Sequence, residues 1–245
     1  MTPVPDSLSL EAIPEAIIDQ VLAAHPGEPA CLTCSFQIED MLVLDLLRAR
    51  QPGIPVLFLE TGYHFPETYA YRDRMTALWN LNLVNVMPEH TVAEQETAHG
   101  RLYRTDSKRC CQLRKVDPLM RALRPYRTWF TGLRRVQSPS RKNLAVSETH
   151  VLPSGESLRK ISPLALWDDK QLWRAAHARG IAALPLYAQG YTSIGCAPCT
   201  AIPAAGADPR SGRWGGDHLE CGIHTATVTT NVTDRGANPD GPATS

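Results

Sequence analysis

Apolar runs that alternate with helical stretches constrain the fold of this chain more than any other feature of its sequence. Runs typical of buried strands lie at residues 30–36, 55–61, 81–88, 127–134 and 156–165. Helices are predicted between them at residues 40–50, 66–79 and most of 92–123, the second of which opens on a proline. This order predicts an α/β fold: a mainly parallel, twisted sheet with helices on both faces. Such sheets bind ligands beyond the carboxyl ends of their strands.

Length and charge narrow the class of protein. A chain of 245 residues can bury a sizeable core, and we expect a single domain at residues 1–225. Residues 226–245 are small and polar without periodicity, which predicts a disordered tail. The formal net charge is +0, so no global field favours nucleic acid or a membrane surface as a partner. No run is long enough to span a membrane, and the N-terminus lacks the basic start of a secretory signal, so we expect a cytoplasmic protein.

Two pairs of cysteines are candidate metal ligands. Cys110 and Cys111 are adjacent in KRCCQLRKV, and Cys196 and Cys199 form a C-x-x-C pair in GCAPCT. Adjacent cysteines chelate one tetrahedral ion poorly because their side chains diverge, whereas each thiolate of an iron–sulfur cluster binds a different iron. The set therefore favours a [4Fe–4S] cluster, with zinc as the alternative. Buried structural thiols are the less favoured alternative.

The other three cysteines predict different roles. Cys221 lies in ECGIH, close to His224, and is a candidate nucleophile if nearby cations stabilise its thiolate. From this segment alone, an exposed thiol without function is an equal alternative. Cys31 and Cys34 form another C-x-x-C in ACLTCSF. Because alternation places them on opposite faces of a strand, we interpret both as buried packing residues.

Two strand-to-helix turns and a set of arginines suggest an anionic ligand. In SFQIED, Ser35 and the amides of the first helical turn can hold a phosphate-like anion, although plain helix capping is preferred for that motif alone. LETGYHFPETY repeats the theme with Thr61 and Gly62. Guanidinium groups suit phosphate and sulfate oxygens, with scattered surface positions as the ordinary alternative. The candidate arginines are Arg134, Arg135, Arg141, Arg210 and Arg213.

Six motifs together resemble one enzyme family. SFQIED, LETGYHFPETY, CCQLRKV, TGLRRVQSPSR, GCAPC and ECGIH occur in the order found in the assimilatory sulfonucleotide reductases, which reduce adenylylsulfate (APS) or phosphoadenylylsulfate (PAPS). The resemblance runs from Ser35 to His224. Members with both cysteine pairs carry a [4Fe–4S] cluster and generally use APS, so the chain resembles that branch. The resemblance implies an adenine-nucleotide hydrolase-like sheet with a flexible, catalytic C-terminal segment.

The resemblance also implies roles for individual residues. Cys110, Cys111, Cys196 and Cys199 match the cluster ligands. Cys221 matches the nucleophile that attacks the sulfur of APS, forming S-sulfocysteine and releasing AMP, after which thioredoxin or a similar thiol reductant frees sulfite. The positions that match substrate-binding motifs are Ser35, Phe36, Gln37, Leu59, Glu60, Thr61 and Gly62 for the nucleotide, and Lys115, Arg134, Arg135, Arg141, Arg210, Arg213 and His224 for the phosphosulfate.

The residue types agree with this chemistry. Sulfur transfer leaves negative charge on the phosphate of AMP, and cations placed in advance stabilise that charge. Lys115 stands four residues beyond Cys111, one helical turn away, so we predict that it lies between the cluster and the phosphosulfate. The chain departs from the family at Gln37 and Ile38, where Gly-Ala is usual, and at His64, where Leu is more usual.

The same residues allow other functions as alternatives. The same reaction on PAPS is the nearest. An ATP pyrophosphatase is disfavoured because the SFQIED turn lacks the Ser-Gly-Gly-x-Asp-Ser phosphate loop. A non-catalytic iron–sulfur or zinc sensor would have no need of Cys221 or the arginines. The sequence leaves the oligomeric state open, a homo-oligomer included.

Overall fold

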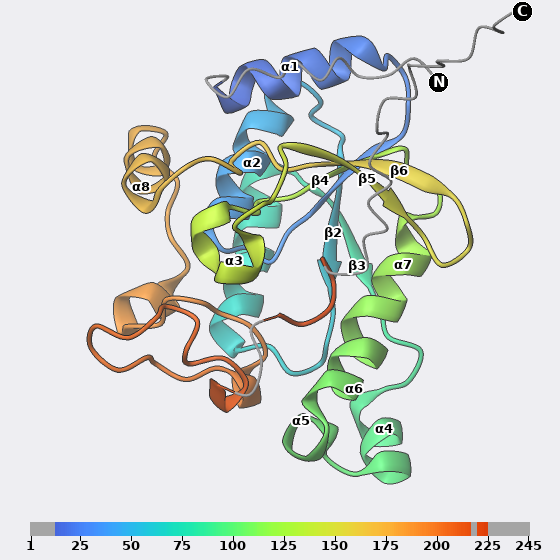
Figure 1. Cartoon of the computed structure of the whole chain (residues 1–245), viewed down its shortest axis with the longest axis vertical. Coiled ribbons are helices and arrows are strands. Elements are labelled where there is room, and N and C mark those ends of the chain that lie inside the picture. Colours follow the sequence, from blue (N-terminus) through green and yellow to red (C-terminus); the bar gives the residue numbers. More distant parts are fainter. Residues whose placement is uncertain (1–12, 217–219, 225–245) are drawn as a thin grey trace, which may run out of the picture.

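A six-stranded sheet forms the centre of the computed structural model, which describes residues 13–216 and 220–224 (Figure 1). The strand order is β3-β2-β1-β4-β6-β5, and only the pairing of β5 with β6 at one edge is antiparallel. The predicted, mainly parallel sheet is therefore confirmed. The predicted tail at 226–245 lies outside the described residues. The strands are β1 (Ala30–Thr33), β2 (Pro55–Leu59), β3 (Asn82–Val86), β4 (Thr128–Phe130), β5 (Ser147–Val151) and β6 (Ser157–Ile161).

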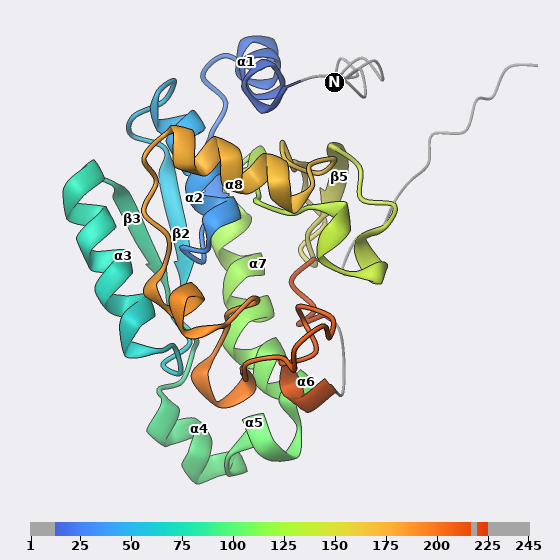
Figure 2. The same ribbon diagram turned by 90° about the vertical axis from the view of Figure 1, so that its left-hand side faces the viewer.

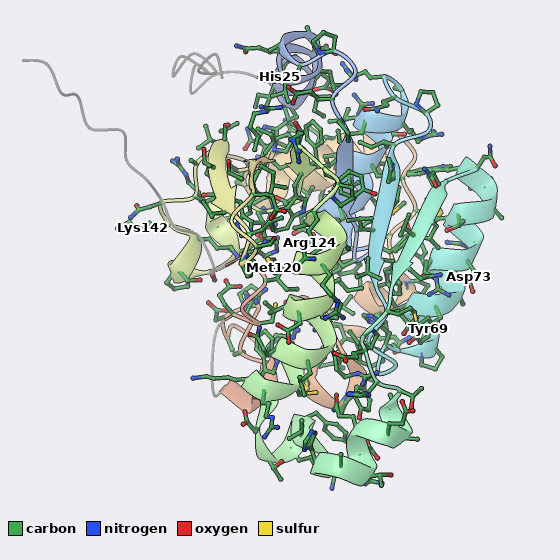
Figure 3. The ribbon with its side chains drawn as sticks, turned by 90° about the vertical axis from the view of Figure 1, so that its right-hand side faces the viewer. His25, Tyr69, Asp73, Met120, Arg124 and Lys142 are labelled. Atoms are coloured by element: carbon green, nitrogen blue, oxygen red, sulfur yellow. The ribbon has the colours of Figure 1, made fainter. Side chains whose placement is uncertain are left out.

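Helices cover both faces of the sheet, as predicted. On one face α1, α2, α3 and α8 pack in the larger core cluster (Figure 2), and on the other α7, which carries Met120, packs in the smaller one (Figure 3). Among the described residues, no helix combines the length and the apolar character that crossing a membrane requires. The α-helices are α1 (Pro14–Ala24), α2 (Ile38–Arg48), α3 (Pro66–Trp79), α4 (Val92–His99), α5 (Leu102–Thr105), α6 (Ser107–Cys111), α7 (Asp117–Leu123) and α8 (Asp169–Ala178).

Alternation along the strands explains the two core clusters. Leu32 of β1 faces the larger cluster and Cys31 faces the smaller one, because successive side chains of a strand point to opposite faces. Cys34 lies in the larger cluster, and both cysteines are at most 2% exposed. Their prediction as buried packing residues on opposite faces is confirmed.

The helical stretch predicted at 92–123 consists of α4, α5, α6 and α7, with a π-helical turn at Gln112–Val116 between the last two. A π-turn adds a residue to one helical turn and is frequent at functional sites. Here it lies between the cysteine pair of α6 and the part of α7 that packs on the sheet. The buried residues of this stretch include Cys110, Cys111, Arg114 and Lys115.

Candidate active site

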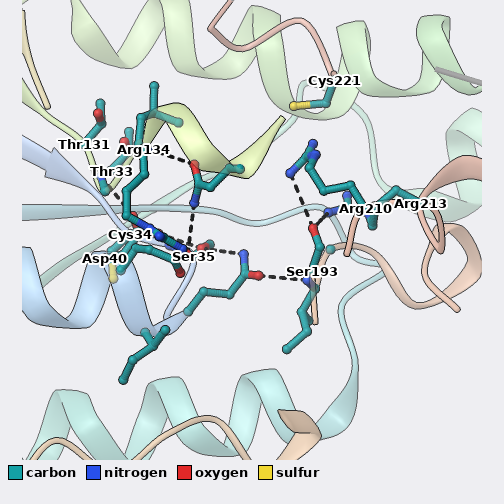
Figure 4. Close-up of a pocket in the computed structure, with 18 of the residues that line it drawn as sticks. Thr33, Cys34, Ser35, Asp40, Thr131, Arg134, Ser193, Arg210, Arg213 and Cys221 are labelled. Atoms are coloured by element: carbon teal, nitrogen blue, oxygen red, sulfur yellow. Dashed lines mark hydrogen bonds and ion pairs between the residues drawn. The ribbon is translucent and has the colours of Figure 1, made fainter. Parts of the chain in front are cut away.

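A cavity of about 610 Å³ opens where the central parallel strands end, at Thr33, Leu59 and Thr131. This is the edge at which α/β sheets bind ligands. Figure 4 shows Cys221 extending into this space, with Arg210 and Arg213 from a different segment beside it. Ten predicted site residues line the cavity: Ser35, Gln37, Leu59, Lys115, Arg134, Arg141, Arg210, Arg213, Cys221 and His224.

The SFQIED turn is held by a carboxylate that the sequence analysis did not select. Asp40 accepts hydrogen bonds from the Ser35 amide (2.7 Å), the Ser35 hydroxyl (2.6 Å) and the Gly132 amide (3.2 Å). A side chain at position 132 would collide with Asp40, so glycine is required for this close approach. Asp40 thus joins the ends of β1 and β4 at the cavity floor.

Phe36 and Gln37 have different surroundings although both belong to the predicted nucleotide turn. The Phe36 ring is fully buried against Phe58 and does not line the cavity. The Gln37 side chain lines the cavity, accepts a hydrogen bond from the Ile194 amide (2.8 Å) and donates one to Ser35 (3.1 Å). The glutamine that departs from the family pattern therefore ties this turn to the segment that precedes the C-x-x-C pair.

Asp40 predicts a measurable pH dependence of stability. Burial raises the pKa of Asp40 to about 6, so between the unfolded value of 3.8 and about 6 the folded state binds more protons than the unfolded state. Through this group, stability therefore falls as pH rises, and from pH 5 to 7.5 the loss is roughly 1 kcal/mol. We expect Asp40→Asn to lack this component in denaturant titrations at both pH values. If the free energy of unfolding changes equally between the two pH values in the wild type and in Asp40→Asn, the raised pKa of Asp40 is contradicted.

The second predicted nucleotide turn, residues 59–62, makes more contacts near the paired cysteines than with the large cavity. Only Leu59 of its four predicted residues lines the cavity. Thr61 is buried and accepts a hydrogen bond from the Cys196 thiol at 3.4 Å. Glu60 forms an ion pair with Arg72 (3.2 Å) and accepts a hydrogen bond from the Gly62 amide (2.8 Å). The backbone continues this support, because the Ala197 amide donates to the Tyr63 carbonyl at 2.7 Å.

The four paired cysteines are brought together, although they are far apart in sequence. Cys110 and Cys111 on α6 and Cys196 and Cys199 of GCAPC line one small cavity beside the larger one. Burial raises the pKa of Cys111 to about 12 and that of Cys199 to about 11, so both are neutral thiols until a metal displaces their protons. Within residues 13–216 and 220–224, no three His, Cys, Asp or Glu side chains are arranged to hold a single metal ion.

The surroundings of this cysteine cavity fit an anionic cluster. Two buried cations line it, Arg114 (3% exposed) and Lys115 (7% exposed), and neither has a carboxylate within ion-pair distance among the described residues. Arg114 donates instead to neutral oxygens, including that of Gln95 at 3.1 Å. The Gln95 amide is 3.9 Å from the sulfur of Cys110. Buried cations without carboxylate partners match the charge of four thiolates on a cluster.

Lys115 lines both cavities and connects them electrostatically. Burial opposes its charge, but attraction to Cys196, Cys111 and Cys221 in their thiolate forms outweighs burial and raises the pKa of the ammonium above its ordinary value. The lysine thus lies among two of the paired cysteines and the candidate nucleophile. Its place between a cluster and a substrate stays a prediction.

Four of the five predicted arginines line the cavity, but they differ in their partners. Arg210 and Arg213 line the cavity beside Cys221, and each donates to the Ser193 hydroxyl, at 3.4 and 3.3 Å. Arg134 lines the cavity too, but it forms ion pairs with Glu39 (2.9 Å) and Asp169 (2.7 Å).

Two other arginines are turned to internal partners. Arg141 binds Glu220, with Nη2 at 2.8 Å from Oε2. Arg135 donates to the Leu144 carbonyl at 2.8 Å and does not line the cavity. No sequence motif predicted the roles of two carboxylates: Glu39, which lines the cavity, and Glu220, which pairs with Arg141 outside it.

His224 is neutral and packed rather than cationic. Its ring stacks on Trp129 with centroids 5.6 Å apart and an interplanar angle of 21°. Burial, followed by the nearby charges of Lys160 and Arg141, lowers the pKa of His224 well below its ordinary value. The ring lines the cavity, so it can contact a ligand, but it contributes no positive charge there.

Comparison with known proteins identifies the family. The model for the phosphoadenosine phosphosulfate reductase domain matches residues 29–202. The chain belongs to the phosphoadenosine phosphosulfate reductase family. Within this family it is 44% identical to adenosine 5'-phosphosulfate reductase of Mycobacterium tuberculosis, over 84% of this chain and 81% of that protein. It is 46% identical to the protein of that name from Mycolicibacterium smegmatis, over 77% of this chain and 80% of that protein.

Solved structures agree with the fold of the family. A phosphoadenylyl-sulfate reductase from Candida auris, determined with phosphate, superposes with a TM-score of 0.67 at 26% identity and covers 78% of this chain and 91% of that one. FMN adenylyltransferase from Candida glabrata shares the fold alone, with a TM-score of 0.57 at 14% identity, over 78% of this chain and 64% of that one.

Proposed function

We propose that this family member reduces APS to sulfite and AMP, with Cys221 as the nucleophile and thioredoxin or a similar dithiol as the reductant. One observation carries the proposal: Cys221 lines a nucleotide-sized cavity together with Lys115, which also lines the cavity of the four paired cysteines. The names of the mycobacterial relatives support the choice of substrate. Free thiols throughout the described chain fit a reducing compartment such as the cytoplasm, where dithiol reductants act.

The cavity offers separate surroundings for the two parts of the substrate. The strand ends and the turn closed by Asp40 provide backbone and small polar groups for the nucleoside. Arg210, Arg213 and Lys115 provide positive charge on the side that holds Cys221. Guanidinium and ammonium groups bind phosphate and sulfate oxygens well, so we expect the phosphosulfate on this side.

In the first half-reaction, the Cys221 thiolate attacks the sulfur of APS. A bond forms between the two sulfur atoms, and the bond from sulfur to the bridging oxygen breaks, so AMP leaves with that electron pair. The negative charge that develops on the phosphate is stabilised by cations already in place, which need no rearrangement during the reaction. The enzyme is left with S-sulfocysteine at position 221.

In the second half-reaction, a thiolate of the reductant attacks the Cys221 sulfur. A mixed disulfide forms, and sulfite leaves with the electron pair of the bond between the sulfurs. The second thiol of the reductant then resolves the mixed disulfide and regenerates the Cys221 thiol. The dithiol supplies both electrons, so the protein needs no other electron donor.

We propose that Cys110, Cys111, Cys196 and Cys199 hold a [4Fe–4S] cluster. When bound, such a cluster supplies a fixed charge distribution beside Lys115. Cys196→Ser is expected to lose most of the iron, because one of the four ligands is replaced, while Cys34→Ala in the core leaves iron unchanged. Anaerobic analysis of iron and acid-labile sulfide tests this. Zinc in place of iron, or equal iron in both variants, would exclude the assignment.

Sulfite release tests the function itself. With thioredoxin and anaerobically purified protein, APS is expected to yield sulfite and AMP in equal amounts, and PAPS far less. The solved relative named phosphoadenylyl-sulfate reductase makes PAPS the second candidate, which the same assay decides. Cluster-loaded protein that releases no sulfite from either nucleotide would support the sensor alternative.

A further inference from the structure

The carboxylate of Glu220, next to Cys221 in sequence, occupies a dense set of donors. Its Oε1 accepts hydrogen bonds from the hydroxyls of Ser138 and Ser140, both at 2.8 Å, and from Nε of Arg141 at 2.9 Å. Its Oε2 accepts Nη2 of Arg141 at 2.8 Å and lies 3.7 Å from Arg210. The side chains of Glu220 and Arg141 are each 11% exposed, so this is a partly buried, bidentate pair.

This carboxylate lies outside the space proposed for the substrate. Cys221 lines the large cavity, whereas Glu220, Ser138 and Ser140 do not. The remaining terminal nitrogen of Arg141 donates to Gln137. The hydrogen bonds of Arg141 therefore hold neighbouring protein groups, although its family motif associates it with the phosphosulfate. Glu220 does not compete with a substrate for the cavity; it fixes the chain immediately before the nucleophile.

The other end of the same pentapeptide is anchored by different contacts. His224 stacks on Trp129, and Ile223 packs against the smaller core cluster. Gly222 has a φ of +89°, and a Cβ at this position would meet Val116 at 3.3 Å, so the chain turns here in a way that favours glycine. Cys221 is therefore held between a polar anchor at Glu220 and an aromatic one at His224.

We propose that Glu220 is a positioning residue for Cys221. Its ion pair with Arg141, supported by Ser138 and Ser140, directs the Cys221 thiol into the cavity for sulfur transfer. This inference rests on the proposed function. The first half-reaction requires the thiol to face the cavity, whereas the second requires it to reach a protein reductant. The contacts of Glu220 with Arg141, Ser138 and Ser140 therefore contribute to the first half-reaction and not to the second.

Glu220→Gln separates these steps, because it keeps the shape of the side chain and removes its charge. In single turnover with APS, formation of S-sulfocysteine, followed by mass spectrometry, is expected to slow about 10- to 100-fold, the effect of losing a charge-assisted hydrogen bond. Sulfite release by thioredoxin from protein that has already formed S-sulfocysteine is expected to change less than about twofold. Glu220→Asp should fall between the wild type and the glutamine variant.

Alkylation of Cys221 by iodoacetamide provides a readout that does not depend on APS. We expect it to be about tenfold faster in Glu220→Gln, because the released thiol spends more time in solvent. Glu89→Gln, at an exposed position, is the matched control and should match the wild type in every assay. Arg141→Gln should resemble Glu220→Gln, and the double variant should be no slower than either single one.

The outcomes are distinct. If Glu220→Gln forms S-sulfocysteine and reacts with iodoacetamide at wild-type rates, the proposal is overturned. If both half-reactions slow equally and thermal melting shows a loss of fold, Glu220 has a structural role only, which also overturns it. If the wild type itself forms no S-sulfocysteine, the proposed function fails, and the alkylation rates alone decide whether Glu220 clamps Cys221.

Discussion

Replacing Cys221 by serine is expected to abolish sulfite release, with a loss of roughly 10⁴-fold or more, as for other removed nucleophiles. Serine has nearly the same shape, so the cavity should be retained. Its hydroxyl, however, is not ionised near neutral pH and cannot form the bond between two sulfur atoms on which the second half-reaction depends. The measurement is sulfite production from APS with thioredoxin.

The controls for this variant follow from the separation of the two cavities. Cys221 lines the large cavity but not the small one lined by the four paired cysteines. Cys221→Ser should therefore keep the iron content and visible absorbance of the wild type, and it should still bind AMP. Residual turnover above about 1% of the wild type, or loss of iron, would show that Cys221 is not a dedicated nucleophile.

The second large effect on activity is expected for Lys115→Met. The substitution keeps most of the apolar length of the side chain and removes a buried charge that lies among Cys111, Cys196 and Cys221. We expect kcat/KM for APS to fall about 10²- to 10³-fold, because a cation placed in advance near the reacting groups is lost. The negative charge of the neighbouring thiolates is then left without this cation, so the visible spectrum of the bound cluster should also change.

A lysine on the same helical stretch provides the control. Lys108 is exposed on α6, so Lys108→Met changes the same net charge without altering either cavity. It should retain activity within about twofold of the wild type. Equal losses in the two variants would indicate a general charge effect, and an unchanged Lys115→Met would remove this lysine from the proposed mechanism.

The sequence predicts the interior strands well because their burial leaves a continuous apolar signal. It does not reveal β5, whose residues SETHV include a single apolar side chain and pair at the sheet edge. Nor does it reveal α8, which buries only Leu172 and Ala176, or α1. The predicted strand at 127–134 is shorter, Thr128–Phe130, because the apolar run continues into the turn that lines the cavity.

Site prediction succeeds where neighbours in sequence act together and is weaker where distant residues pair. The two cysteine pairs and Cys221 are visible as motifs. The pairing of Arg141 with Glu220 joins residues 79 positions apart, so no local pattern shows that this arginine is already engaged. Thr61 likewise faces Cys196, although its turn resembles a nucleotide-binding turn. Asp40 could have been suspected only as an acidic residue at a helix start.

The π-helical turn at Gln112–Val116 sets how far α7 is rotated about the helix axis relative to α6. Before it, Cys110 and Cys111 face the small cavity lined by the four paired cysteines; after it, Leu119 and Leu123 face the sheet. Deleting one residue, such as Leu113, would convert the turn to regular α-helix and rotate one segment against the other by about 100°. Either the ligands or the core contacts would then point away from their partners. The extra residue rotates the helix so that its first part lines the cysteine cavity and its second part packs on the sheet.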